Sequence, residues 1–91
     1  ANQWRLKTTR DFTTGNANPA HTAALDRYGH GTHVAALLGS DAPGALGVAP
    51  NVSFVSLRVL NNIGGGQTSH VINAIQWAIT NRQAFGIDII N

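Results

Sequence analysis

Two histidines three residues apart are the strongest chemical signal in this chain of 91 residues. His30 and His33 stand in the run YGHGTHVA at residues 28–35, and on a helix this spacing places both side chains on one face. Such a pair is consistent with hydrogen-bonded core histidines, with a zinc site, or with a general base that exchanges a proton near neutral pH. A zinc site would need His21, His70 or an aspartate as further ligands, because the chain has neither Cys nor Glu. The spacing leaves all three interpretations open.

A run of three glycines, Gly64, Gly65 and Gly66, is the second feature with chemical meaning. Glycine has no Cβ, so another backbone can approach it closely, as it must where a peptide adds alongside as an extra strand. A flexible connecting loop is the simpler explanation, and the glycine run by itself favours it.

The elements that must position these residues are read from the apolar pattern. Residues 3–7 alternate as a short edge strand does, and residues 13–26 have loop composition. A short, mostly buried helix is predicted from His30 to Gly39, with Gly39 as its C-terminal cap. Residues 52–60, VSFVSLRVL, predict a strand buried on both faces.

A second helix and a further strand are predicted after the glycines. Ser69 is the expected N-cap, Gly86 the expected end, and one apolar face is expected to comprise Val71, Ile72, Ile75, Ala78 and Ile79. Residues 87–90 are expected to form a strand. Strand, helix and strand over residues 52–90 predict a parallel βαβ unit, and therefore an α/β fold.

Composition excludes several classes of protein. With 43% apolar and 11% charged residues, the chain is not a disordered charged tail. A net charge of +2 is too weak for a nucleic-acid-binding surface, so no nucleic-acid partner is expected. The absence of Cys excludes disulfides and thiolate zinc sites. No apolar run is long enough for a membrane span, so no membrane partner is expected.

Taken together, segments along residues 26–91 resemble the subtilisin-like serine proteases, the subtilases of peptidase family S8. The segments are YGHGTHVA at 28–35, GVAPNV at 47–52, LRVL at 57–60, GGGQ at 64–67, INAIQWA at 72–78 and IDIIN at 87–91. Their order matches that of the family. The resemblance implies a portion of a three-layer α/β/α fold with a mostly parallel sheet, in which residues 1–91 form part of one catalytic domain without a second domain.

The resemblance also implies roles for individual residues. His30 matches the family's catalytic histidine, which takes a proton from the nucleophilic serine and delivers it to the leaving amine. His33 matches a structural histidine inside the helix. Gly64, Gly65 and Gly66 match the segment along which the substrate backbone adds as a strand. The implied activity is that of a serine endopeptidase, with a polypeptide substrate and with a pro-region or an inhibitor as further candidate partners.

Only the histidine of the Asp-His-Ser triad is found within these residues. Asp11 and Asp26 precede His30, but neither stands in the family's aspartate context, and Asn91 is not the oxyanion asparagine. We therefore expect a fragment of a serine endopeptidase that is inactive as the 91-residue chain. The alternative is a catalytically inactive, protease-like binding or structural module.

Expectations about metals and compartment follow from the same resemblance. Residues 39–46 are fewer than in the calcium-binding loop of the secreted bacterial enzymes and offer Asp41 as their one carboxylate. No metal site or other cofactor is therefore expected in this segment, although calcium elsewhere in the parent protein is compatible with the family. The resemblance favours a secreted, extracellular protein, while intracellular relatives leave the compartment undecided.

Overall fold

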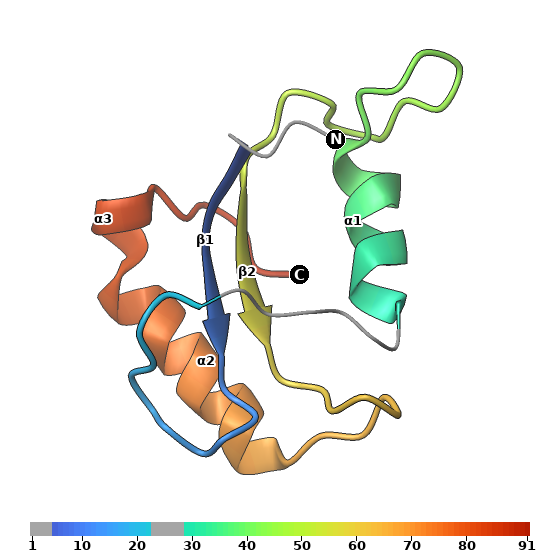
Figure 1. Cartoon of the computed structure of the whole chain (residues 1–91). Helices are drawn as coiled ribbons and strands as arrows, with labels where there is room; N and C mark the ends of the chain where they lie inside the picture. Colours follow the sequence, from blue (N-terminus) through green and yellow to red (C-terminus); the bar gives the residue numbers. More distant parts are fainter. Residues whose placement is uncertain (1–4, 23–28) are drawn as a thin grey trace.

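The part of the chain that the structure describes contains two parallel strands flanked by helices. The computed structural model describes residues 5–22 and 29–91, with His30 described by its backbone alone. The elements are β1 (Leu6–Asp11), α1 (His30–Gly39), β2 (Phe54–Arg58), α2 (Thr68–Thr80) and α3 (Arg82–Phe85). In Figure 1, α1 lies on one side of the strands, and α2 with α3 lies on the other. This layered arrangement confirms the α/β fold class.

The sheet pairs β1 with β2 in parallel. Its register runs from Leu6 opposite Phe54 to Asp11 opposite Arg58, with one irregularity between Leu6 and Thr8. α1 lies between the two strands in sequence, so the βαβ unit of this structure is β1–α1–β2. The predicted edge strand is therefore real, although it begins and ends later than residues 3–7.

The strand predicted at residues 87–90 is wrong. The Ile87 amide donates to the Arg82 carbonyl (2.9 Å), which closes the turn after α3, and residues 87–91 join no strand. The Ile87 side chain packs against the core instead. A short apolar run predicts burial as readily as it predicts a strand, and a strand also needs a neighbour that accepts its hydrogen bonds.

The outer edge of β1 is covered by residues 19–22 of the predicted loop. The Thr9 amide donates to Nδ1 of His21 (3.3 Å), and the Thr22 amide donates to the Thr9 carbonyl (3.1 Å). Nη1 of Arg10 donates to the Pro19 carbonyl (2.8 Å). These bonds satisfy backbone groups that an edge strand otherwise leaves open to pairing with other chains.

The core lies between α2 and the sheet. Phe12, Ala74 and Trp77 are buried, and the Phe12 and Trp77 rings meet edge to face with centroids 6.4 Å apart. The partly buried residues around them are Val55, Leu57, Val59, Phe85 and Ile87. The guanidinium of Arg10 stacks over the Trp77 ring at 5.1 Å, which covers the outer side of this core.

The apolar face predicted for the second helix is mostly wrong. α2 buries Ala74, Trp77 and Ala78, whereas Ile75 and Ile79 are 42% and 66% exposed. The buried face is formed by two alanines and the indole ring of Trp77, which packs against Phe12 in the core. Of the predicted stripe, Ala78 alone is buried.

The ends of the second helix also differ from the prediction. α2 begins at Thr68, and its last turn is interrupted at Asn81, whose side-chain amide donates to the Trp77 carbonyl (2.9 Å). Asparagine competes in this way for backbone groups that a helix would otherwise use. α3 follows, and Gly86 ends it in the left-handed region at φ 63°, which confirms Gly86 as the stop signal.

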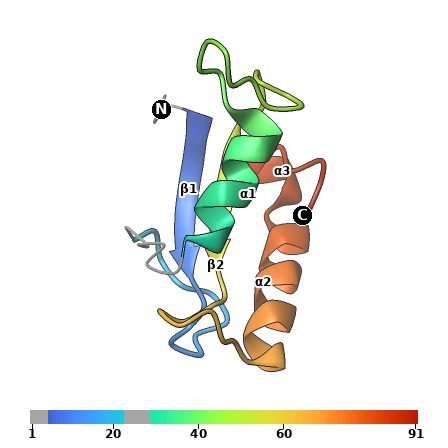
Figure 2. The same ribbon diagram turned by 90° about the vertical axis from the view of Figure 1, so that its right-hand side faces the viewer.

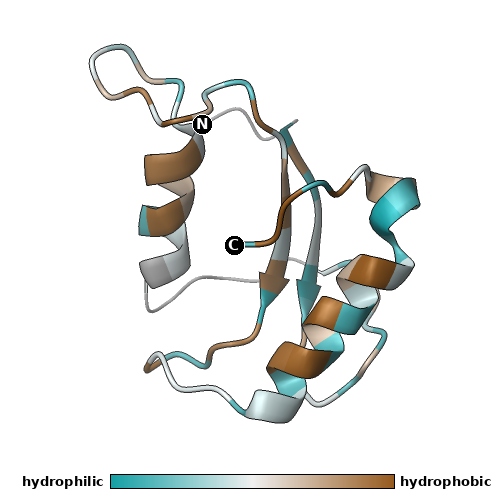
Figure 3. Cartoon of the chain, turned by 180° about the vertical axis from the view of Figure 1, so that it is seen from behind, coloured by the Kyte–Doolittle hydropathy of each residue, from teal (hydrophilic) through white to brown (hydrophobic). Residues whose placement is uncertain are grey.

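α1 has the predicted bounds but is less buried than expected. Its Leu37 is 59% exposed. Figure 3 shows that the second half of α1 is hydrophobic, and that the segment after α3 is hydrophobic apart from Asp88. Gly39 is the last helical residue and not a left-handed cap. A Cβ there would lie 2.6 Å from Cζ of Phe54 and 2.8 Å from Cγ1 of Val52, so Gly39 is required by close packing.

Candidate active site

Three segments that are far apart in sequence gather at the carboxyl ends of β1 and β2. They are the turn after β1, the first turn of α1 and the loop of residues 61–67, here called the glycine loop (Figures 1 and 2). In parallel α/β sheets this is the end at which ligands bind. The fold thus brings the backbone of His30 and the three glycines to the same end of the molecule.

The helix that carries His30 begins at a glycine in a left-handed conformation. Gly29 has φ 92°, a value that residues with a Cβ rarely adopt, and its carbonyl accepts the His33 amide (3.1 Å). His30 is therefore the first residue of α1, at the edge of the candidate site. Its imidazole lies outside the part of the chain that the structure describes, as does Asp26.

His33 lies on the surface of α1. It is exposed and lines an open cavity of about 340 Å³ between α1 and the loop that follows it. The core-histidine interpretation is therefore wrong for His33. Among the described residues, no three His or Asp side chains lie close enough together to hold a metal ion. The zinc alternative depends on the His30 side chain and stays untested.

The glycine loop is held in a defined shape by Asn61. Oδ1 of Asn61 accepts the amides of Ile63 and Gly65, each at 3.0 Å. The Asn61 amide donates to the Gly65 carbonyl (2.7 Å), and the Gly64 amide donates to the Asn61 carbonyl (3.1 Å). The glycine run is therefore part of a hydrogen-bonded turn.

Two of the glycines are required by the backbone itself. Gly64 has φ 84°, and a Cβ on Gly66 would lie 2.7 Å from the Val59 carbonyl oxygen. A cavity of about 240 Å³ opens beside them. Its lining residues are Thr13, Val59, Asn61, Gly65, Gly66, Gln67 and His70. The loop thus offers a backbone surface next to a small polar cavity.

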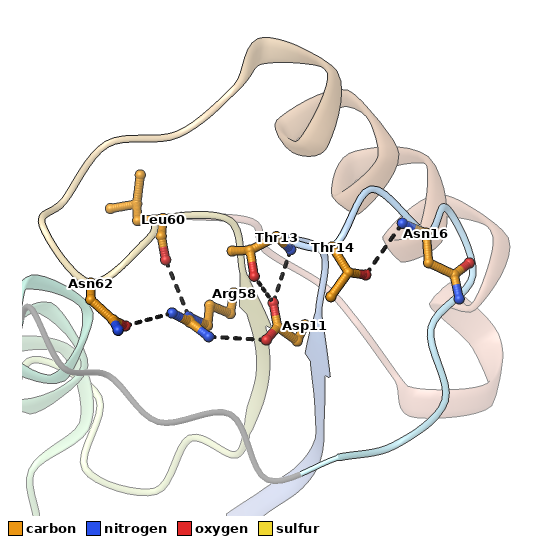
Figure 4. A network of polar contacts seen from close by, with 7 residues as sticks. All are labelled: Asp11, Thr13, Thr14, Asn16, Arg58, Leu60 and Asn62. Atoms are coloured by element: carbon orange, nitrogen blue, oxygen red, sulfur yellow. Dashed lines mark hydrogen bonds and ion pairs between the residues drawn. The ribbon is translucent and has the colours of Figure 1, made fainter.

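An ion pair joins the carboxyl ends of the two strands next to the glycine loop. Nη1 of Arg58 donates to Oδ2 of Asp11 (3.0 Å), Nη2 to Oδ1 of Asn62 (2.8 Å) and Nε to the Leu60 carbonyl (3.2 Å). Oδ1 of Asp11 accepts the Thr13 amide (2.9 Å) and hydroxyl (2.5 Å). Figure 4 shows that Arg58 stands between Asp11 on one side and the start of the glycine loop on the other.

These contacts shift the pKa of Asp11. Burial raises it, but the hydrogen bonds from Thr13 and the charge and hydrogen bond of Arg58 together outweigh burial, so the pKa lies below its ordinary value of 3.8. Asp11 is therefore a carboxylate at neutral pH. Both of its oxygens are occupied by Thr13 and Arg58.

Sequence reasoning did not find Asn61, Arg58 or Thr13 as parts of the site. A signal for Asn61 was present, since asparagine just before glycines commonly accepts backbone amides two residues further along. Asp11 carried the same signal for Thr13, because its side chain accepts the amide two residues further along. Arg58 gave no such signal, because its role depends on the pairing of β1 with β2.

A buried guanidinium from the residue before β1 packs against the loop after α1. Arg5 is 6% exposed, its Nε donates to the Val52 carbonyl (2.7 Å), and its Nη1 lies 3.8 Å from Oδ2 of Asp41. Asp41 thus faces a fixed positive charge.

Comparison with known proteins decides the family. The subtilase family matches residues 5–91 of the chain. The chain belongs to the subtilase family. This match extends the likeness to β1, which the motifs of residues 26–91 did not include.

Individual relatives are similar over most of this subtilase chain. Subtilisin DY of Bacillus licheniformis is 46% identical over 68 residues, or 72% of the chain and 23% of that protein. Subtilisin E of Bacillus subtilis strain 168 is 40% identical over 82 residues, or 88% of the chain and 19% of the relative. Alkaline serine exoprotease A of Vibrio alginolyticus is 44% identical over 71 residues, or 78% of the chain and 12% of the relative.

The chain therefore spans roughly a fifth of the length of the subtilisins that it matches. Within the ranges that the structure covers, no helix is both long and apolar enough to cross a membrane.

Proposed function

We propose that the protein containing this segment is a serine endopeptidase in which His30 is the general base. The observation that carries the proposal is the subtilase match over residues 5–91, which includes the histidine motif at the start of α1. The placement of that helix start and the glycine loop at the same end of the sheet supports it.

The proposed chemistry divides between two segments. His30 takes the proton of a serine hydroxyl as that oxygen attacks the scissile carbonyl, and it returns the proton to the leaving amine. Gly64, Gly65 and Gly66 accept the substrate as an added strand, because a hydrogen-bonded turn without side chains lets a peptide backbone approach. The triad serine and aspartate come from residues outside 1–91 in this proposal. The 91-residue chain by itself is then inactive.

Partners, compartment and cofactors complete the proposal. The substrate is a polypeptide, and a pro-region or an inhibitor peptide would occupy the same glycine segment. The resemblance favours an extracellular location. We propose that this segment holds no cofactor and that no calcium ion binds through Asp41, because that carboxylate is already opposite Arg5.

The test uses the full-length natural protein and a peptide substrate of several residues. We expect His30→Ala to lower kcat by at least about 100-fold, because general acid–base catalysis supplies that much or more. The matched control is His33→Ala, one turn further along the exposed side of α1, which should keep most of the activity. A serine-directed acylating reagent should label the wild type and label His30→Ala far more slowly.

Two results would contradict the proposal. One is full activity of the His30→Ala variant. The other is a folded wild-type protein that binds an extended peptide but neither cleaves it nor reacts with the acylating reagent. That second result would favour the alternative of an inactive, protease-like binding module.

A further inference from the structure

A chain of polar contacts runs from the end of β1 to the centre of the glycine loop. Asp11 is fixed by Thr13 and pairs with Arg58, the last residue of β2. Arg58 reaches the carbonyl of Leu60 and the side chain of Asn62, the residues on either side of Asn61 (Figure 4). Asn61 in turn holds the amide of Gly65.

Each nitrogen group of the Arg58 guanidinium has a different partner. The planar fork of arginine can satisfy three acceptors at fixed angles, and a lysine ammonium cannot reproduce that geometry. The pair is also partly sheltered, with Arg58 and Asp11 side chains 23% and 19% exposed, so solvent screens it less than a fully exposed ion pair. These contacts fix the direction in which the loop leaves the sheet.

We propose that Asp11 and Arg58 are positioning residues that hold the Gly64–Gly66 backbone in the shape that accepts a substrate strand. The inference rests on the proposed function, in which those glycines pair with substrate. Neither side chain touches the substrate. They act through Asn61 and Asn62, so their effect is on the binding of extended peptides and not on the proton transfers at His30.

The test compares Arg58→Gln, Arg58→Lys and Asp11→Asn in the full-length protein, with Arg82→Gln as the control. Arg82 is an exposed arginine on α3 whose side chain makes none of these contacts. Substrates are a single-residue ester, too short to reach the glycines, and an extended peptide. For Arg58→Gln and the extended peptide we expect KM to rise about 10-fold or more with kcat nearly unchanged. The ester should be cleaved as by wild type.

The remaining variants separate charge from geometry. Arg58→Lys keeps the charge and should be intermediate, because an ammonium cannot hold both Leu60 and Asn62. If the two residues act as one unit, Asp11→Asn combined with Arg58→Gln should be little worse than Arg58→Gln alone. Arg82→Gln should match the wild type.

Amide hydrogen exchange gives a readout that needs no activity. We expect faster exchange at residues 61–67 in Arg58→Gln and unchanged exchange at the buried residues of α2. Unchanged exchange in the loop overturns the inference. Equal losses on the ester and the extended peptide also overturn it, because they would indicate a general loss of folded enzyme. If the wild type cleaves nothing, the proposed function fails, and the affinity of the variants for the extended peptide still decides the inference.

Discussion

At the scale of single residues, the site depends on partners that sequence distance conceals. Asp11 and Arg58 are 47 residues apart in the sequence, and nothing in the sequence pattern marks either as the partner of the other. Their contact follows from the parallel register of β1 and β2, which sets Asp11 opposite Arg58. Asp11 could be taken for a catalytic acid, but its carboxylate is paired with Arg58.

The lowered pKa of Asp11 predicts how stability responds to acid. Its stabilising contribution is complete above 3.8, the ordinary value of the unfolded carboxyl, and is lost as the pH falls through the lower pKa of the folded state. Urea unfolding of the full-length protein from neutral pH to about pH 2 should show this loss. Asp11→Asn should remove that part of the acid dependence.

The control for this titration is Asp88→Asn, which changes an exposed aspartate after α3. An Asp11→Asn variant with the same acid dependence as wild type would show that the Arg58 pair adds nothing to stability.

At the scale of elements, glycine positions explain where the chain can approach itself. Adding one methyl group at Gly39 should destabilise the fold, because a Cβ there would clash with Phe54 and Val52. We expect Gly39→Ala to lower the free energy of unfolding by about 1–3 kcal/mol, as overpacking does. Chemical denaturation of the full-length protein measures this change in free energy.

A double-mutant cycle with Phe54→Leu tests the cause. Because the smaller side chain makes room for the added methyl group, the Gly39→Ala change should be less destabilising in the Phe54→Leu background. Strict additivity of the two changes would show that the packing explanation is incorrect.

The elements also show what sequence patterns can and cannot predict. The bounds of α1, the stop at Gly86 and the strand centred on Phe54–Arg58 were predictable, because they depend on local composition and on glycine. The buried face of α2 was not, because Ala74 and Trp77 are selected by the shape of the surface opposite. The apolar run at residues 87–90 was misassigned, because a strand exists only with a partner.

The same distinction applies to the candidate site. Gly64, Gly65 and Gly66 carried a visible signal, and the motif around His30 carried a strong one. The roles of Asn61 and Arg58 were not predictable, since hydrogen bonds between loops and strand ends are set by tertiary geometry. The catalytic assignment of His30 stays a prediction that mutagenesis must test.

At the scale of the whole molecule, the two edges of the sheet differ. Residues 19–22 cover β1, whereas no strand among the described residues pairs with the far edge of β2. Large apolar side chains are also exposed, including Leu37 at 59% and Ile89 at 86%. Open sheet edges and apolar patches promote association between chains.

We therefore expect the isolated 91-residue chain to be partly unfolded or to self-associate, and to cleave no peptide. Size-exclusion chromatography and thermal unfolding measure the first property, and a peptide assay measures the second. A monomer with one cooperative transition would contradict the expected association. Cleavage that His30→Ala abolishes would contradict the expected inactivity.

The pairing of β1 with β2 also bears on how quickly the fold forms. Leu6 lies opposite Phe54 in the register. The chain between them, which contains α1 and two loops, must therefore close into a loop before β1 and β2 can pair. Closing a flexible loop of that length costs on the order of 3 kcal/mol of chain entropy. Because this entropy is lost before the parallel contacts compensate for it, the segment should fold slowly, and its apolar strand is exposed to other chains during that delay.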